Sequence, residues 1–204
     1  MGWYSTHLLP RLLDIGCGQR TTGALRSRAC ADLAGSVLEI GFGSGHNIQH
    51  YPDAVQRVVA VEPSELAWRL AAARVSGAVV AIDRQAMDAQ DLPFADATFD
   101  ACLSTWTLCS IPDAIVALRE VRRVLRPGGT LHFLEHGVGF DDSVRRWQGR
   151  LEPLQRRLFG GCHLTRSIGE LVTAAGLEVI ELDTFYMDGS PKVTGATYLG
   201  VARA

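Results

Sequence analysis

Short apolar runs alternate with helical periodicity from residue 37 to the end of the chain. The runs predict strands at 37–41, 57–61, 78–82, 99–104, 129–136, 177–184 and 193–203. Between them, apolar residues at three- and four-residue spacing predict helices at 64–75, 112–125 and 165–176. This alternation is typical of a mostly parallel sheet covered by helices on both faces. We therefore expect a three-layer α/β fold in which the last hairpin makes one strand antiparallel.

Capping residues mark the ends of two of these helices. Pro112 and Asp113 open the second predicted helix, and the RPGG turn at 126–129 stops it. Thr165 is expected to cap the third predicted helix, which Gly176 ends.

The segment 137–164 is an insertion between the fifth and sixth strands, and we expect it to cover the substrate pocket. Residues 141–160 within it are helical in pattern, but Gly149 and Pro153 predict breaks in that helix. Its arginines predict a solvated helix face, with an interfacial membrane contact as the alternative. They are Arg145, Arg146, Arg150, Arg156 and Arg157.

Two stretches combine an apolar run with glycines, LLDIGCG at 12–18 and VLEIGFGSG at 37–45. The leucines of the first recur at helical spacing and no third glycine follows, so it predicts a helix over 5–16 that ends in glycines. In the second, Gly41, Gly43 and Gly45 permit a sharp turn after a strand and a close approach of ligand to backbone. The second stretch is therefore the predicted nucleotide loop.

An acid at the end of the next strand supports this prediction. Glu62 follows Gly41 at the distance where a carboxylate binds a ribose diol in doubly wound sheets. The dinucleotide fingerprint GxGxxG would need glycine at position 46, where the chain has His46. A nicotinamide-dependent oxidoreductase is therefore disfavoured, although it stays an alternative, as does a cofactor-binding protein without turnover.

Length and composition narrow the class of protein. The 204 residues suit one domain, and a net charge of −2 argues against binding nucleic acid through phosphates. Five cysteines without metal-ligand spacing predict free thiols in the cytoplasm and no metal site. Neither a signal peptide nor an integral membrane segment is expected. The oligomeric state stays open between monomer and homodimer.

Four motifs in order resemble the class I S-adenosylmethionine-dependent methyltransferases. They are VLEIGFGSGHN, VVAVEPS, DAQDLPFADATFDACLS and REVRRVLRPGGTLHFLEHG, all within residues 37–137. The resemblance implies a Rossmann-like fold and S-adenosylmethionine as cofactor. It places the methionine end of the cofactor at the glycine loop, the ribose at Glu62 and the adenine at Asp88. The cofactor-binding residues that it implies are Glu39, Gly41, Gly43, Gly45, Asn47, Glu62, Pro63, Asp88, Ala89, Ser104 and Thr105.

Finer likeness extends beyond these motifs. TLCSIPD, LRPGGTLHFLEHG and FGGCHLTR are similar to a group that includes animal thiol S-methyltransferases, which are themselves close to quinone-biosynthesis methyltransferases. The resemblance implies a small-molecule methyl acceptor, which can be a thiol. A quinone-type C-methyltransferase and a phospholipid-type N-methyltransferase are the alternatives.

Candidates for the acceptor side follow from their places on the sheet. His136 ends the fifth strand and is a candidate base or substrate contact, or else binds a backbone carbonyl. Trp106 is a candidate aromatic wall, and His163 either reaches the pocket or caps a helix. Tyr4 belongs to an N-terminal segment, 1–35, that is expected either to form a helical lid or to pack on the back of the sheet.

Overall fold

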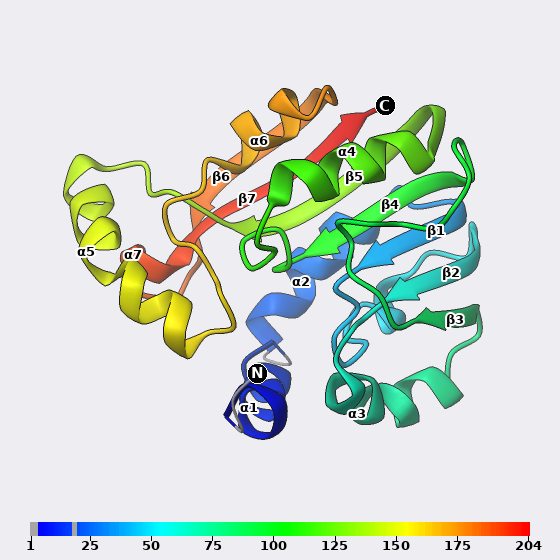
Figure 1. Cartoon of the computed structure of the whole chain (residues 1–204), viewed down its shortest axis with the longest axis horizontal. Coiled ribbons are helices and arrows are strands. Elements are labelled where there is room, and N and C mark those ends of the chain that lie inside the picture. Colours follow the sequence, from blue (N-terminus) through cyan, green and yellow to red (C-terminus); the bar gives the residue numbers. More distant parts are fainter. Residues whose placement is uncertain (1–3, 18–19) are drawn as a thin grey trace.

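The computed structural model describes residues 4–17 and 20–204. One sheet has the strand order β3-β2-β1-β4-β5-β7-β6 (Figure 1). β7 is antiparallel to both of its neighbours, and the pairs among β1 to β5 are parallel. The strands are β1 (Gly35–Ile40), β2 (Val55–Val61), β3 (Ala81–Gln85), β4 (Phe99–Thr105), β5 (Leu125–His136), β6 (Glu178–Tyr186) and β7 (Ala196–Arg203). The expected mostly parallel sheet with one antiparallel strand is confirmed.

Helices cover both faces of this sheet. α4 (Ala114–Val124) and α6 (Ile168–Ala174) lie on one face and α2 (Arg20–Cys30) on the other (Figure 1). α5 (Asp142–Leu158) lies beyond the carboxyl ends of the parallel strands. The remaining elements are the π-helical turn η1 (Tyr4–Leu8), α1 (Leu9–Cys17), the 3-10 turn η2 (Ile48–His50), α3 (Glu65–Ser76) and α7 (Lys192–Gly195).

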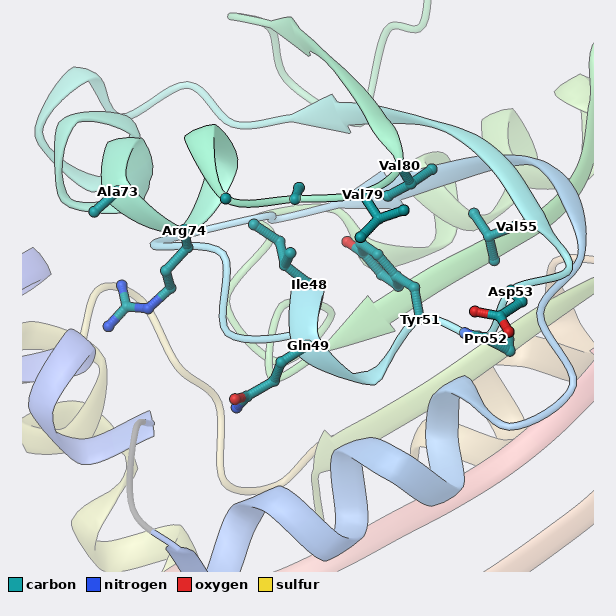
Figure 2. Close-up of a pocket in the computed structure, with 12 residues that line it drawn as sticks. Ile48, Gln49, Tyr51, Pro52, Asp53, Val55, Ala73, Arg74, Val79 and Val80 are labelled. Carbon is teal, nitrogen blue, oxygen red and sulfur yellow. The ribbon is translucent and has the colours of Figure 1, made fainter.

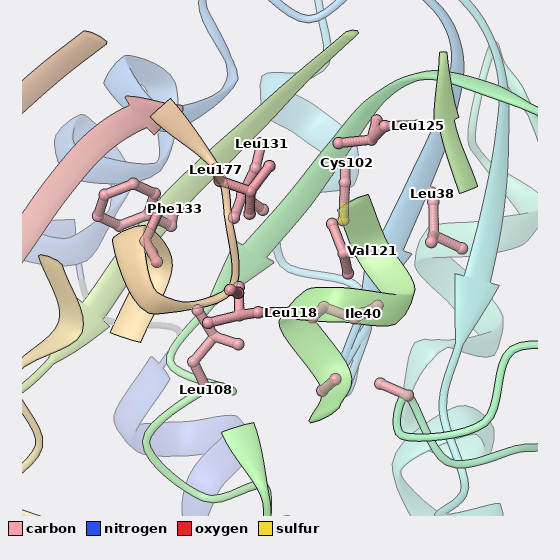
Figure 3. Packing of buried hydrophobic residues seen from close by; sticks show 14 of the residues in the cluster. Leu38, Ile40, Cys102, Leu108, Leu118, Val121, Leu125, Leu131, Phe133 and Leu177 are labelled. Carbon is pink, nitrogen blue, oxygen red and sulfur yellow. The ribbon is translucent and has the colours of Figure 1, made fainter. Parts of the chain in front are cut away.

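Alternating side chains build the two cores. Leu38 and Ile40 point from β1 into the cluster beneath α4 and α6, which Figure 3 shows with Phe133 from β5. Val37, the residue before Leu38, points to the opposite face in the period-two pattern and meets the α2 side. Because both faces are covered, most buried side chains of the central strands are apolar. Burial of each large apolar side chain contributes roughly 1.5–3 kcal/mol to folding.

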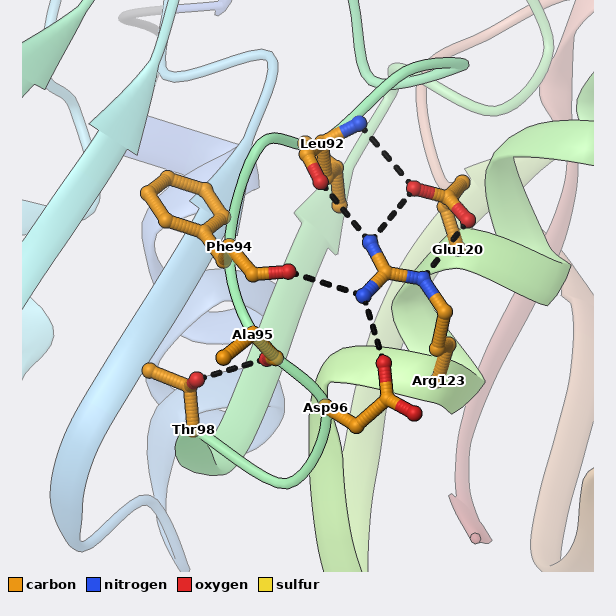
Figure 4. Close-up of polar contacts among 7 residues, drawn as sticks. All are labelled: Leu92, Phe94, Ala95, Asp96, Thr98, Glu120 and Arg123. Carbon is orange, nitrogen blue, oxygen red and sulfur yellow. Dashed lines mark hydrogen bonds and ion pairs between the residues drawn. The ribbon is translucent and has the colours of Figure 1, made fainter.

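An arginine joins α4 to the loop before β4 (Figure 4). Arg123 donates through Nη1 to the Phe94 carbonyl at 2.8 Å and through Nη2 to the Leu92 carbonyl at 2.7 Å. Its guanidinium also pairs with Glu120 at 2.7 Å and with Asp96 at 2.8 Å. The loop that leads from Asp88 to β4 is therefore fixed against the helix.

Several predicted boundaries are wrong. The third strand begins at Ala81, not at 78, because Gly77 and Ala78 close the end of α3 with backbone hydrogen bonds. Ser167 stands at the N-cap of α6 in place of Thr165. The last predicted strand starts with the helical turn α7, and β7 begins at Ala196.

α5 is continuous through the two residues that predict breaks in it. Gly149 is four residues before Pro153, so its carbonyl is the one that the proline leaves without a helical donor. Both residues are exposed, and water can satisfy that carbonyl. Asp113, by contrast, caps α4 as expected, because its carboxylate accepts from the Val116 N–H at 3.1 Å.

The N-terminal prediction is confirmed in part. Residues 12–17 of the first glycine-containing stretch lie in a helix, α1, and not in a strand. Residues 1–3 and 18–19 of the expected lid segment lie outside the described residues. α2 has no counterpart among the predicted elements. Its sequence, RTTGALRSRAC, has weak helix propensity, and burial of Ala29 and Cys30 against the sheet holds it in place.

Candidate active site

The carboxyl ends of β1, β2 and β4 lie side by side, because β1 pairs with both of the other strands. Three glycines follow β1 with positive φ angles, 67° at Gly41, 58° at Gly43 and 78° at Gly45. Only glycine adopts this conformation without steric cost. The loop therefore turns back across the ends of the three strands.

Two of these glycines meet different surroundings. A Cβ at Gly41 would overlap the side chain of Thr107, which follows β4. A Cβ at Gly43 would have its nearest neighbour, the Gly41 carbonyl oxygen, 3.9 Å away. Gly41 thus lets two loops pack closely, whereas the backbone at Gly43 is open to approach by a ligand.

Glu62 ties the loop after β2 to this glycine loop. Its Oε2 accepts from the Gly43 N–H at 2.7 Å, and its Oε1 accepts from the Ser64 N–H at 2.6 Å. The residue is 7% exposed, and burial raises the pKa of the carboxyl group while the two backbone donors oppose that rise. Each oxygen retains a free lone pair. Glu62 can therefore accept hydrogen bonds from two neighbouring hydroxyl groups of a ligand.

A second buried carboxylate lies beneath the loop. Glu39 accepts from Asn47 Nδ2 at 2.9 Å and from the hydroxyl of Tyr51. Burial raises the pKa of Glu39 to about 7, even though both hydrogen bonds and the charge of Arg26 act in the opposite direction. Asn47 Nδ2 also donates to Thr105 Oγ1 at 2.9 Å. This network joins the residues that follow β1 to the end of β4.

Arg26 of α2 completes the network, and the sequence interpretation missed it. Its Nη1 donates to Asn47 Oδ1 at 2.6 Å and to Thr105 Oγ1 at 3.1 Å. The guanidinium carbon lies 4.6 Å from the centroid of the Trp106 ring. Arg26 is buried, but nothing in its local sequence signals this, because α2 was itself not predicted.

The other predicted cofactor residues lie at the same edge of the sheet. Asp88 follows β3 and accepts from the Gln90 N–H at 2.9 Å and from Gln90 Nε2 at 2.8 Å. Ala89 is buried next to it, and Pro63 directly follows Glu62. Ser104 differs, because its hydroxyl donates to Glu135 at 2.7 Å and not to the glycine-loop network.

Glu135 organises the loop after β4, a role that the sequence interpretation missed. It is fully buried and accepts from the Ser104 hydroxyl, from the Thr107 N–H at 3.0 Å and from the Cys109 N–H at 3.4 Å. Burial raises the pKa of this carboxyl group, and these donors oppose the rise. The sequence signal is an acid that directly follows the apolar residues Phe133 and Leu134 in the predicted strand.

Trp106 and His136 stand together at the ends of β4 and β5. Their ring centroids are 5.9 Å apart, and Trp106 has a positive φ of 51°, which is unusual for a large side chain. Trp106 Nε1 and His136 Nδ1 are buried without a hydrogen-bond partner among the described residues. Burial lowers the pKa of His136 to about 4, despite a hydrogen bond with the Ala196 backbone. The imidazole is therefore neutral at physiological pH.

Tyr4 and His163, the other two predicted pocket residues, both contact α5. The Tyr4 hydroxyl donates to the Leu158 carbonyl at 2.7 Å, so the N-terminal segment meets the end of α5. The backbone N–H of His163 donates to the Cys109 carbonyl at 2.8 Å, while its imidazole Nδ1 lies 2.7 Å from Glu152. His163 thus adjoins the loop after β4, but its ring is engaged with α5.

A cavity of about 490 Å³ is lined in part by Tyr51 (Figure 2). Its walls include Val55, the first residue of β2, and Val79 and Val80, which precede β3. It therefore opens at the amino ends of these strands. Ligands of open α/β sheets bind at the carboxyl ends, so this cavity is not the predicted cofactor site.

The fold and the residues gathered at the carboxyl ends of β1, β2 and β4 define the class of protein: an α/β nucleotide-binding fold of the methyltransferase type. A methyltransferase domain family model matches residues 38–133. Thiol S-methyltransferase TMT1A of Homo sapiens is 33% identical over 152 residues, covering 72% of this chain and 62% of that protein. The C-methyltransferase UbiE of ubiquinone and menaquinone biosynthesis from Desulfotalea psychrophila is 36% identical over 126 residues, covering 60% of this chain and 50% of that protein.

A solved structure extends the likeness to the whole fold. A SAM-dependent methyltransferase from Thermotoga maritima superposes with a TM-score of 0.66 at 21% identity, covering 98% of this chain and 99% of that one. Residues 38–133 thus belong to a methyltransferase domain family, and the chain as a whole is similar to S-adenosylmethionine-dependent methyltransferases. It spans less than two thirds of the length of the thiol S-methyltransferases that it matches. Within residues 4–17 and 20–204, no helix combines the length and apolar character needed to cross a membrane.

Proposed function

We propose that this protein transfers the methyl group of S-adenosylmethionine to a small-molecule acceptor, and that the acceptor is a thiol. One observation carries the cofactor half of the proposal. Gly43 and Glu62, which come from different motifs, meet through a 2.7 Å hydrogen bond at the ends of β1 and β2. That contact places a backbone open to a ligand beside a carboxylate whose oxygens each keep a free lone pair. A nucleoside needs such acceptors for its ribose hydroxyls.

The residues around this contact fit the cofactor in chemistry. Glu62 would accept from the ribose hydroxyls and Asp88 from the adenine amino group. The glycine loop, with Glu39, Asn47 and Thr105 behind it, would face the methionine end. When bound, S-adenosylmethionine supplies an electrophilic methyl group on a sulfonium. The chain's part is to hold the acceptor in line, and orientation of this kind can be worth up to about 7–11 kcal/mol.

The thiol assignment is supported by the relatives and by the residues at the ends of β4 and β5. Thiol S-methyltransferases of human and rat are 32–33% identical to this chain. Trp106 offers an aromatic wall, and the free Nδ1 of neutral His136 is a hydrogen-bond acceptor for a thiol. A thiol reference pKa of about 8.5 makes the thiolate accessible without a strong base. The N-terminal α1, with Tyr4 before it, is proposed as the lid.

Calorimetry on the purified chain tests the cofactor half. Adenosylmethionine and adenosylhomocysteine should bind, and NAD should not. Glu62→Ala should weaken adenosylmethionine binding at least roughly tenfold, because a hydrogen bond to a charged group is worth about 1.5–3 kcal/mol. Glu65→Ala, which removes an exposed carboxylate three residues later, is the control and should bind normally.

A matched glycine pair tests the loop without relying on charge. Gly43→Ala and Gly128→Ala both place alanine at a positive φ in uncrowded surroundings. Both variants should lose similar stability, but only Gly43→Ala should lose adenosylmethionine binding. Equal adenosylmethionine binding by the two variants would show that the glycine loop is not part of the cofactor site.

Assays with methyl-labelled cofactor test the acceptor. Small alkyl and aryl thiols should be methylated, whereas quinols and phospholipid amines should not. The 36% identity to a quinone C-methyltransferase makes quinol methylation the second candidate, and a labelled quinol would establish it instead. Tight cofactor binding with no labelled product from any acceptor class would leave a binding protein without turnover.

A further inference from the structure

α5 exposes an apolar stripe to solvent. Trp147, Leu151, Leu154 and Leu158 recur at spacings of four, three and four, so they share one face of the helix. Trp147 is 54% and Leu154 is 55% exposed. Solvent-exposed large apolar residues are ordinary when scattered, but a contiguous row of them marks an interaction surface.

The helix is held so that this stripe cannot turn inward. Val144 and Gln148 are the residues of α5 that are buried. Gln148 accepts from the Gly139 N–H at 2.7 Å and donates to the carbonyls of Gly137 at 3.1 Å and Val193 at 3.0 Å. These three hydrogen bonds fix the rotation of α5 about its axis, and the stripe remains on the outer side.

Arginines border the stripe along one edge. Arg146, Arg150 and Arg157 are four and seven residues apart and therefore lie in a second row beside the first. None of the three pairs with a carboxylate among the residues that the structure describes. The guanidinium of Arg150 lies 5.3 Å from the Trp147 ring centroid. α5 is thus a basic helix in a chain whose net charge is −2.

We infer that α5 lies flat on an anionic lipid surface, with the stripe in the headgroup boundary and the arginine row on the lipid phosphates. A tryptophan and arginines beside a row of leucines is the pattern of interfacial helices. A second copy of the chain fits less well, because two stripes packed antiparallel would bring their arginine rows to the same side. This inference does not depend on methyl transfer.

The lipid surface would adjoin the proposed acceptor side. Leu158, the last residue of α5, accepts a hydrogen bond from the Tyr4 hydroxyl through its carbonyl. Farther along the chain, the sulfur of Cys162 lies 3.5 Å from the sulfur of Cys109 in the loop after β4. Leu8 of η1 and Leu12 of α1 are two more exposed leucines, on the N-terminal segment that Tyr4 joins to this end of α5. The carboxyl end of α5 is thus connected both to the segment of α1, the proposed lid, and to the loop after β4, which follows Trp106.

Vesicle flotation with the full chain tests the inference. The protein should float with vesicles of phosphatidylcholine mixed with phosphatidylglycerol, float weakly with phosphatidylcholine alone, and be released by salt. Leu154→Glu should reduce partition at least roughly tenfold. Val79→Glu, which puts the same charge at a fully exposed apolar residue before β3, should leave it unchanged. Arg150→Gln should reduce partition about fivefold, and Arg119→Gln on α4 should not.

The outcomes separate the alternatives. Absence of flotation with anionic vesicles overturns the inference. So does an equal loss in Leu154→Glu and Val79→Glu, since it would show no role for the stripe. A concentration-dependent dimer in light scattering that Leu154→Glu abolishes, without vesicle binding, would assign the stripe to a second copy. Should Leu154→Glu fail to fold by near-ultraviolet circular dichroism, Trp147→Gln takes its place.

Discussion

The two sides of the candidate site differ in how their carboxylates and ring nitrogens are paired. On the side of β1 and β2, the carboxylates of Glu39 and Glu62 each accept two hydrogen bonds within the chain. On the side of β4 and β5, ring nitrogens of Trp106 and His136 are buried without a partner among the described residues. We therefore propose that the cofactor side is built by the fold itself and that a bound acceptor completes the other side. Changes on the first should therefore alter stability, and changes on the second should alter turnover.

The largest effect is expected at Gly41. Gly41→Ala imposes a left-handed conformation on alanine, at roughly 1–2 kcal/mol, and a clash with Thr107, at roughly 1–3 kcal/mol. Urea unfolding should show a loss of about 2–5 kcal/mol, and adenosylmethionine binding should disappear. Gly128→Ala shares the positive φ but has open space around it, and should lose only about 1 kcal/mol. Equal losses in the two variants would mean that the loops are not packed as described.

The next effect concerns the pH dependence of stability. The folded-state pKa of Glu39 is raised to about 7, so its ionisation opposes folding. This group contributes stability that is full below its unfolded pKa near 4.5 and is lost as pH rises through 7. Glu39→Gln mimics the neutral acid. The free energy of unfolding of the variant, relative to that of the wild type, should rise by roughly 2–4 kcal/mol between pH 5 and pH 8.

Unfolding curves at a series of pH values measure this gain. Glu178→Gln, at an exposed position on β6, is the control and should follow the wild type at every pH. A constant difference between Glu39→Gln and the wild type across the range would show that Glu39 is ionised throughout.

The same division explains what could be predicted from the sequence. Gly41, Gly43, Gly45 and Glu62 were identified because a bound nucleoside demands glycines and an acid at fixed spacing, and that demand is local in the chain. Arg26 could not be identified, since its burial depends on α2 packing against β4 and β5. The exposure of the apolar stripe of α5 could not be predicted for a related reason. Periodicity shows that a helix has an apolar face but not which partner covers that face.

The mostly parallel sheet and its one antiparallel strand were predictable, whereas β3 was displaced by three residues. The apolar residues Val79 and Val80 read as strand, but Val79 is fully exposed beside the cavity. Short apolar runs do not reveal where pairing begins, which is decided by the register of β3 against β2.

A smaller effect, on turnover, is expected at His136. With a pKa near 4, the imidazole is too weak a base to hold a thiol proton, so its contribution should be a positioning hydrogen bond. His136→Gln removes the polar atom at the Nδ1 position and should lower kcat/KM about tenfold. His136→Asn retains a polar atom there and should lose less. A loss of more than a thousandfold in both, with a wild-type rate limb near pH 6.5, would instead identify a titrating base.

The smallest effect is expected where the proposed lid meets the cofactor side. Asp14 of α1 lies 2.9 Å from His46 Nε2 and 3.2 Å from Arg74 Nη1. Burial opposes ionisation of Asp14, but its hydrogen bond with Ser44 and the charges of Arg74 and His46 hold its pKa below the ordinary value. Such partly exposed pairs are worth about 0–1 kcal/mol, so Asp14→Asn should weaken adenosylmethionine binding by no more than about fivefold.

Stopped-flow release rates give the sharper measurement of this contact. If α1 closes over bound cofactor, Asp14→Asn should accelerate release and leave association nearly unchanged, because the contact forms after the cofactor has entered. Asp142→Asn removes an aspartate that faces Arg145 within α5, away from the lid, and should change neither rate. An effect of Asp14→Asn on association alone would place α1 at the entrance as a charged surface and not as a lid.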